Sequence, residues 1–120
     1  MSIVSRRDRI VNRVSLRGEL SDLPEITDTA GGVPVANLDV AVPYTVGAGV
    51  NLFRATAYGQ LAVEIDNANL TVGDVVDITG ELQQEKWTNK QTGKEYDKVV
   101  ILAKRVRLVP DVDAEVQREN

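Results

Sequence analysis

The sequence has neither cysteine nor histidine in its 120 residues. The lack of cysteine excludes disulfides, thiolate catalysis and cysteine-based zinc sites. The lack of histidine removes the commonest general base and metal ligand, so only carboxylates or lysine remain for catalytic chemistry. We therefore expect a protein that is not an enzyme and that carries no cofactor or metal.

Aromatic residues and long apolar runs are scarce as well. The chain has one Trp, one Phe and three Tyr, so its core must be aliphatic, and the dominance of valine favours strands. No apolar run is long enough to cross a membrane, and the N-terminus has no signal-peptide core. These absences predict a soluble, cytoplasmic protein. The chain length predicts one domain, because a chain of this length supports one core and not two.

The net charge of −4 is distributed unevenly along the chain. Residues 1–20 and 81–107 each carry a net charge of +3, whereas residues 21–80 carry −7 and residues 108–120 carry −3. A polyanion responds to the local field and not to the total charge, so the two basic segments are compatible with a nucleic-acid partner. Solvated strand faces explain the same charges equally well.

Apolar and polar residues alternate in several stretches, which predicts strands at 11–20, 33–42 and 51–59, and a turn followed by a fourth strand at 71–82. Within the fourth strand, we expect Val76, Ile78 and Leu82 to point inward. Residues 21–32 contain Pro24 and a Gly-Gly pair and are interpreted as a long turn. Residues 60–69 fit one short helix with an apolar stripe.

The stretch QQEKWTNKQTGKEYDKV, residues 83–99, predicts a long hairpin with its tip near residues 89–93 and a return strand that runs to residue 109. It contains Trp87, the single tryptophan, with hardly any apolar neighbours in the sequence. Burial of an indole is worth roughly 2 kcal/mol or more, so its place outside any apparent core requires an explanation. Cross-strand packing against Tyr96 is one explanation, and a binding role is the other.

Five strands with a helix between the third and the fourth predict an all-β OB-fold, a small Greek-key barrel of a kind that binds oligonucleotides. A five-stranded sandwich fits the strand count too. We expect a flexible basic arm at 1–9, the OB-fold domain at 10–109 and a polar, disordered tail at 110–120.

Five blocks of the sequence, in this order and spacing, resemble bacterial single-stranded-DNA-binding proteins. The blocks are VNRVSLRGELSDLPEI, GVPVANLDVAV, FRATAYGQLAVEI, LTVGDVVDITGEL and EKWTNKQTGKEYDKVVI. The resemblance covers roughly residues 10–108. It implies sequence-independent binding of single-stranded DNA by base stacking and phosphate neutralisation, in replication, recombination and repair. It also implies a homo-oligomer, with a tetramer favoured over a dimer, and a nucleoid-associated location.

The resemblance further implies which residues bind DNA. Trp87 and Tyr58 match stacking positions of the family, and Arg54 matches a basic residue on the face of Tyr58. Arg13 and Lys86 lie where the family commonly has a cation. Adding the lysines of the predicted hairpin, the candidate binding residues are Trp87, Tyr58, Arg54, Lys86, Arg13, Lys90, Lys94 and Lys98. Packing on the strand face is the alternative role for Tyr58.

Several departures from the family pattern keep other functions open. Leu52 stands where the family usually has a stacking Trp, and the connection at 43–51 has no Lys, Arg or Trp. Phe53 is expected in the core or at a subunit interface. The chain also lacks the acidic, Pro-Phe-ending tip through which family members recruit replication and repair enzymes. One alternative is therefore a primosomal or accessory OB-fold module that acts mainly through protein contacts. The other is an enzyme with carboxylate chemistry, which no residue spacing supports.

Overall fold

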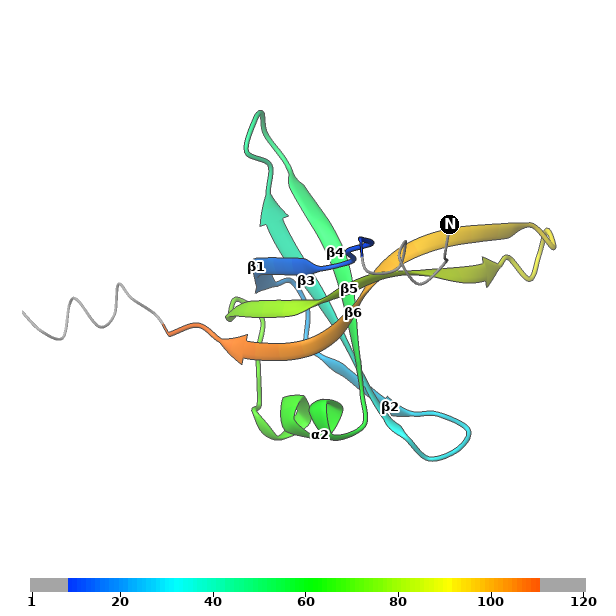
Figure 1. Cartoon of the computed structure of the whole chain (residues 1–120), viewed down its shortest axis with the longest axis horizontal. Helices are drawn as coiled ribbons and strands as arrows, with labels where there is room; N and C mark the ends of the chain where they lie inside the picture. Colours follow the sequence, from blue (N-terminus) through cyan, green and yellow to red (C-terminus); the bar gives the residue numbers. More distant parts are fainter. Residues whose placement is uncertain (1–8, 111–120) are drawn as a thin grey trace, which may run out of the picture.

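The computed structural model describes residues 9–110. Six strands and one helix follow one another along these residues (Figure 1). They are β1 (Val14–Leu20), β2 (Glu25–Asp28), β3 (Pro34–Pro43), β4 (Val50–Tyr58), α2 (Gln60–Asn67), β5 (Val75–Thr88) and β6 (Glu95–Leu108). Apart from residues 9 and 110, the expected basic arm and polar tail lie outside the described residues. Within them, no helix has the length and apolar character needed to span a membrane.

All six strands form one sheet in the order β1-β5-β6-β4-β3-β2. A second pairing of β1 with β3, at Glu19 with Ala41 and Leu20 with Val40, closes this sheet into a barrel. The pairing of β4 with β6 is parallel, and the other pairings are antiparallel. A closed, mainly antiparallel barrel with a helix after β4 has the architecture of an OB-fold, which confirms the predicted fold class.

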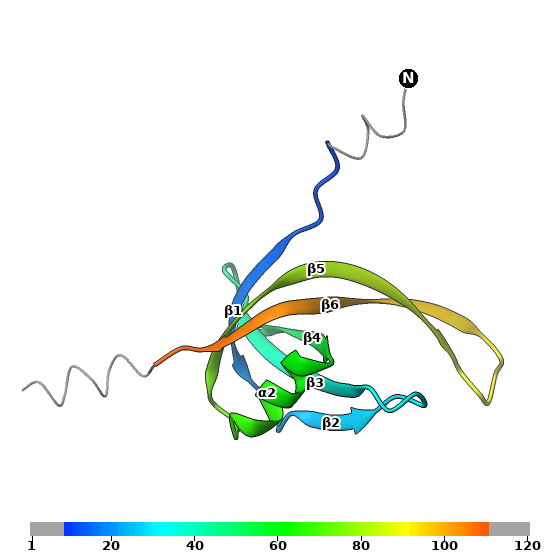
Figure 2. The ribbon, with the colours of Figure 1, turned by 60° about the horizontal axis from the view of Figure 1, so that its bottom comes forward.

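The core is aliphatic, as the scarcity of aromatic residues requires. Alternate side chains of β3, β4 and β5 point into the barrel, including Leu38, Val40 and Ile78. Helix α2 covers one end of the barrel and contributes Ala62 and Ile65 to the same cluster (Figure 2). Burial of these aliphatic side chains is the main source of stability for the barrel.

Strand β2 corrects the interpretation of residues 21–32 as a long turn. Its four residues pair with β3, from Glu25 opposite Asn37 to Asp28 opposite Pro34, and form a hairpin that projects from the barrel. All four side chains of β2 are exposed. The strand is therefore stabilised by main-chain pairing along the edge of β3. Because none of its side chains is buried, the sequence shows no alternation of apolar and polar residues that would predict it.

The inward orientation predicted for Leu82 is wrong, since this side chain is 49% exposed. The pairing of β5 with β6 is irregular at Thr79 and Gly80, and β5 leaves the barrel beyond this point. At Gly80 a side chain would collide with the carbonyl of Leu102, so the two strands approach closely where the barrel ends. The predicted hairpin itself is confirmed, with residues 89–94 connecting its two strands.

Candidate nucleic-acid interface

The β5–β6 ribbon has one continuous outer face, which on the barrel is the face that points away from the core. Cross-strand partners recur on it at every second residue of β5. From the hairpin toward the barrel these pairs are Trp87/Tyr96, Glu85/Lys98, Gln83/Val100, Glu81/Leu102, Thr79/Arg105 and Asp77/Arg107. Aromatic and charged side chains that are far apart along the chain are therefore aligned on one surface.

Trp87 and Tyr96 form an aromatic platform near the tip of the hairpin. Their ring centroids lie 5.4 Å apart, with an angle of 35° between the ring planes. Trp87 nevertheless remains 52% exposed and Tyr96 41% exposed. The side-chain amine of Lys94 lies 5.4 Å from the centroid of the Tyr96 ring, within the range of a cation–π contact. Packing holds the indole in place, and half of its surface is left for another flat ring.

The connection at the tip is ordered by Asn89. Its side-chain oxygen accepts hydrogen bonds from the backbone N–H groups of Gln91 and Thr92, at 2.9 and 3.2 Å. Its backbone N–H donates to the carbonyl of Lys94, and Gly93 adopts a φ of 73°, which favours glycine. These bonds fix the turn that places Lys94 beside the aromatic platform.

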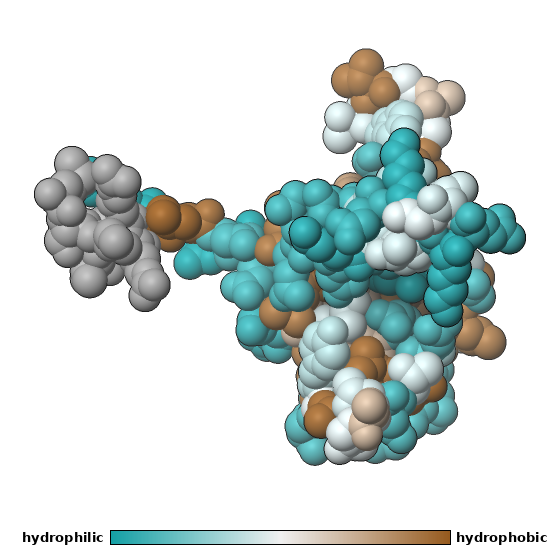
Figure 3. Space-filling view, turned by 90° about the vertical axis from the view of Figure 1, so that its right-hand side faces the viewer, coloured by the Kyte–Doolittle hydropathy of each residue, from teal (hydrophilic) through white to brown (hydrophobic). Residues whose placement is uncertain are grey.

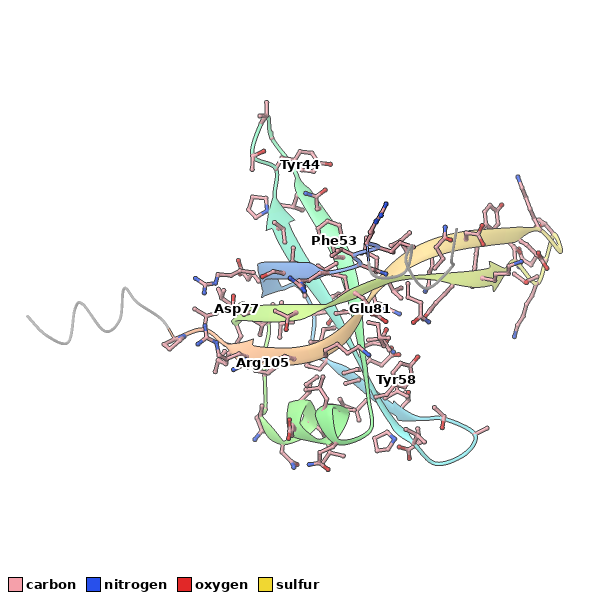
Figure 4. All side chains as sticks on the ribbon, viewed as in Figure 1. Tyr44, Phe53, Tyr58, Asp77, Glu81 and Arg105 are labelled. Carbon is pink, nitrogen blue, oxygen red and sulfur yellow. The ribbon has the colours of Figure 1, made fainter. Side chains whose placement is uncertain are left out.

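Tyr58 lies at the end of β4, away from the platform, and is 45% exposed (Figure 4). It is paired with Val35 of β3, which in turn is paired with Thr27 of β2. Gly59 follows with a φ of 66° and turns the chain into α2. Tyr58 therefore presents its ring on the barrel wall beside the β2–β3 hairpin, separate from Trp87 in the structure.

Arg54 has a partner that the sequence did not reveal. Its guanidinium donates to the carboxylate of Asp39 on β3, with N–O distances of 3.1 and 3.4 Å. This hydrogen bond raises the pKa of Arg54, and the charges of Glu25 and Glu85 contribute in the same direction. A phosphate group would have to compete with Asp39 for this cation.

The four hairpin lysines are exposed, but the structure divides them between two faces. Lys98 lies on the face of Trp87, opposite Glu85, and Lys94 lies over Tyr96. Lys86 is paired with Asp97 on the opposite face of the ribbon, and Lys90 belongs to the connection at the tip. The predicted path of cations is therefore not continuous on one surface.

Arg13 is exposed and directly precedes β1, next to the base of the hairpin. Its neighbour Asn12 makes two hydrogen bonds to the main chain of Leu82, each of 2.8 Å. The amide of Asn12 donates to the Leu82 carbonyl and accepts from the Leu82 N–H, which extends the pairing of β1 with β5 by a side chain. Sequence reasoning missed Asn12, because no local pattern links it to a residue 70 positions away.

No group of three or more acidic residues within 9–110 is arranged to hold a metal ion. The candidate site residues described above are aromatic side chains, cations and the main-chain elements that position them. Aromatic rings and cations suit a polymer of flat bases that are joined by negatively charged phosphates.

Two comparisons relate this chain to known proteins. The model of the single-strand binding protein family matches residues 11–109, which include all six strands and the helix. The single-stranded DNA-binding protein of Aquifex aeolicus (strain VF5) is 34% identical over 107 residues, which cover 83% of this chain and 71% of that relative. The chain belongs to the single-strand binding protein family.

Proposed function

We propose that this protein binds single-stranded DNA with the Trp87–Tyr96 platform as its principal stacking site. The observation that carries this proposal is an indole that is held against Tyr96 and is still half exposed. Every base has a π-face, so such a platform accepts any sequence. Members of this family bind DNA and are not enzymes, in agreement with the expectation from the lack of histidine and cysteine.

Fewer cations lie where they could neutralise phosphates than the sequence predicted. Lys94 and Lys98 lie beside the platform, where they would contact phosphates between stacked bases. Arg54 is engaged by Asp39, and Tyr58 would act as a separate stacking position on the barrel wall. With these two phosphate contacts the slope of log K against log salt would be near −1.4, at about −0.7 per contact.

Family membership implies roles in DNA replication, recombination and repair. A protein that coats single-stranded DNA would be located with the nucleoid, and we propose this location for the present chain.

Members of the family form oligomers, and we propose a homotetramer for this chain, with a dimer as the smaller alternative. Support comes from β1, which pairs with β5 along one edge but with β3 only at Glu19 and Leu20. Among residues 9–110, no strand pairs with the rest of its second edge, at residues 14–18, and a second copy would satisfy the main-chain groups there. Light scattering at micromolar concentration tests this proposal, and a monomer would contradict it.

A titration with oligo-dT tests the stacking site directly, because the single tryptophan reports on it alone. We expect the emission of Trp87 to be quenched substantially as the oligonucleotide is added. Mixed-sequence oligonucleotides should quench it to a similar extent, since phosphate contacts and stacking carry little base preference. Binding that leaves the emission unchanged would place the DNA elsewhere on the protein.

A second candidate function, protein recognition by an accessory module, is favoured by the β3–β4 hairpin. Between Asp39 and Arg54 this projecting arm has no charged residue. Its tip exposes Tyr44, Val46 and Val50 and forms the brown and white projection at the top of Figure 3. Exposed apolar surfaces of this kind mark interaction sites. No measurable DNA binding at about 20 mM salt, where phosphate contacts are strongest, would favour this function over the first.

A further inference from the structure

Strand β2 is the last strand of the sheet and has an open edge. It pairs with β3 on one side, and within residues 9–110 no strand pairs with its other side. The N–H of Thr29 donates to the carbonyl of Val33 at 2.8 Å, so in the alternating pattern of an antiparallel pair Thr27 is the next residue bonded to β3. The main-chain groups of Ile26 and Asp28 therefore point away from β3, toward the open edge.

An open depression lies beside this edge, between β2 and α2. Its volume is about 180 Å³, and its lining includes Leu23, Ile26, Ile65, Asp66 and Leu70. Ile65 and Leu70 are buried, whereas Leu23 is 61% exposed and Ile26 36% exposed. A strand added to the open edge would direct every second side chain toward one face, where such a depression can receive it. Free main-chain groups and an apolar depression are thus combined in one place, the β2 groove.

The β2 groove is surrounded by negative charge. Residues 18–53 and 55–85 contain a single type of charge, because neither range has a Lys or an Arg. Asp66 lines the depression, and Glu25 and Asp28 are exposed on β2 itself. Two copies of β2 paired with each other would bring like charges together, which is unfavourable, and a phosphate backbone is disfavoured for the same reason. The groove therefore suits an extended segment that carries cations and an apolar side chain.

One segment of this chain has that chemistry. Residues 1–9, MSIVSRRDR, contain Ile3 and Val4 followed by three Arg and one Asp. Residues 108–120 carry a net charge of −3 and would be repelled. We propose that residues 1–9 of a second copy, the basic arm, dock in the β2 groove as an added strand. One of the two apolar side chains then enters the depression, and the arginines lie beside the acidic side chains.

The arm comes from a second copy because of where the chain enters β1. Asn12 is bonded to Leu82 at the base of the long hairpin, and β1 then runs about 20 Å before the chain reaches β2. Figure 2 shows the described residues before β1 leaving the barrel on the side away from α2 and β2. A nine-residue segment is at most about 30 Å long, and the arm of the same copy would use most of this length to run back along β1.

The β2 groove and Tyr58 lie on opposite faces of the β2–β3 pair. Thr27 is paired with Val35, and Val35 with Tyr58, so these three residues share one face. Ile26 is paired with Ala36, which belongs to the core, and therefore lies on the other face. An arm in the groove thus leaves Tyr58 accessible to a base.

This contact joins copies in an open-ended series, because the arm and the groove are different surfaces. A strand of four residues offers few main-chain hydrogen bonds, so the contact is weak between free copies. Copies that are bound side by side on one DNA strand have a high local concentration, which makes a weak contact effective. The arm therefore makes binding to a long strand cooperative. This role rests on the proposed function, whereas the contact itself does not.

Three variants of the full chain separate the groove from the arm. Ile26→Thr makes the groove less apolar and keeps a β-branched side chain on the strand. Val33→Thr is its matched control, because Val33 is 43% exposed on the same hairpin but does not line the depression. Ile3→Ser/Val4→Ser removes the apolar part of the arm and keeps its cations, so any phosphate contact of the arm is retained. Melting curves check that all three variants fold.

The first measurement contains no DNA and follows hydrogen exchange at single amides. A synthetic peptide of residues 1–9, at millimolar concentration, should slow exchange at Ile26 and Asp28 several-fold. Exchange at Thr27 should not change, because its N–H is already bonded to β3. Absence of slowing at Ile26 and Asp28 would overturn the contact.

The controls of this measurement test the apolar and the charged part of the contact. Ile26→Thr should lose the slowing, and Val33→Thr should keep it. The same peptide with Arg6→Glu and Arg7→Glu should have no effect on the unaltered protein. Equal responses to the two peptides would overturn the contact.

The second measurement counts the copies on oligo-dT of about 200 nucleotides, which holds about three tetramers at up to about 16 nucleotides per OB-fold. At half saturation, the unaltered protein and Val33→Thr should fill some strands and leave others empty. Ile26→Thr and Ile3→Ser/Val4→Ser should spread evenly, with unchanged affinity for a strand that holds one tetramer.

Three outcomes would contradict parts of the proposal. Even spreading of the unaltered protein, together with slowing by the peptide, would overturn the second copy as occupant and assign the groove to a strand of another protein with the same chemistry. Cooperative filling that only Ile26→Thr abolishes would overturn the arm. Absence of all DNA binding would overturn the proposed function, and the peptide measurement would still decide the contact.

Discussion

Residues 75–79 of β5 lie in the barrel, whereas beyond Gly80 the same strand continues into the projecting hairpin. In the first part, Val76 and Ile78 are fully buried and alternate with more exposed neighbours. In the second part, side chains on both faces of the strand are exposed, including Leu82 and Trp87. The first part is stabilised by apolar burial and the second by main-chain pairing and cross-strand contacts. Substitutions should therefore alter stability in the barrel part and binding in the hairpin part.

The largest effect is expected from Ile78→Ala in the barrel. Removal of this fully buried side chain leaves a cavity and should lower the free energy of unfolding by about 2–5 kcal/mol. Denaturant melts measure this change, with Gln84→Ala on the exposed hairpin as the control. The fraction that stays folded should bind oligo-dT as before. A similar loss of stability in both variants would remove the distinction between the two parts of β5.

The opposite behaviour is expected from Trp87→Ala in the hairpin. Loss of the stacking surface should weaken binding of a labelled oligo-dT by about 1–3 kcal/mol, with little change in melting temperature. Val99→Ala is the matched control, because Val99 is also exposed on the ribbon but lies on the opposite face. Unchanged affinity with a large fall in melting temperature would show that the indole serves cross-strand packing alone.

A smaller effect is expected at the boundary between the two parts, where Asn12 contacts Leu82. Asn12→Ala removes two hydrogen bonds to the main chain and should reduce stability by about 1 kcal/mol, since both groups are accessible to water afterwards. Hydrogen exchange at the Leu82 amide should accelerate more than exchange at Ile78. Uniform acceleration along β5 would mean that the two parts open together.

The smallest effect concerns pH and the ionised Asp77. The pKa of this carboxyl is depressed in the folded protein, so its contribution to stability is present above the unfolded value of about 3.9 and is lost as the pH falls through the lower folded value. The melting temperature of the unaltered protein should therefore fall more steeply below about pH 4 than that of Asp77→Asn. The difference should be small, because the ion pairs of Asp77 with Arg17 and Arg107 lie on the surface. Parallel curves would show that this network contributes no stability.

The sequence-based predictions succeeded where the structure depends on patterns that are local along the chain. Alternation along a strand is a local pattern, and it located the barrel strands, the aliphatic core and the long hairpin. It could not locate β2, because all four of its side chains are exposed and its stability comes from pairing with β3. It also misplaced Leu82, since the same pattern continues where the strand leaves the barrel.

The sequence by itself determined that the protein is an OB-fold of a DNA-binding family and that Trp87 lies on a hairpin. Strand periodicity, turn residues and the five blocks are all written in short segments. Only the tertiary structure decided which cations are engaged in ion pairs and which remain available to bind phosphate. Strand register brings Asp39 to Arg54 across 15 residues, and it brings Arg17, Asp77 and Arg107 together from three strands. Ion pairs act over a few ångströms in space, so the separation of two residues along the chain does not reveal whether they are neighbours.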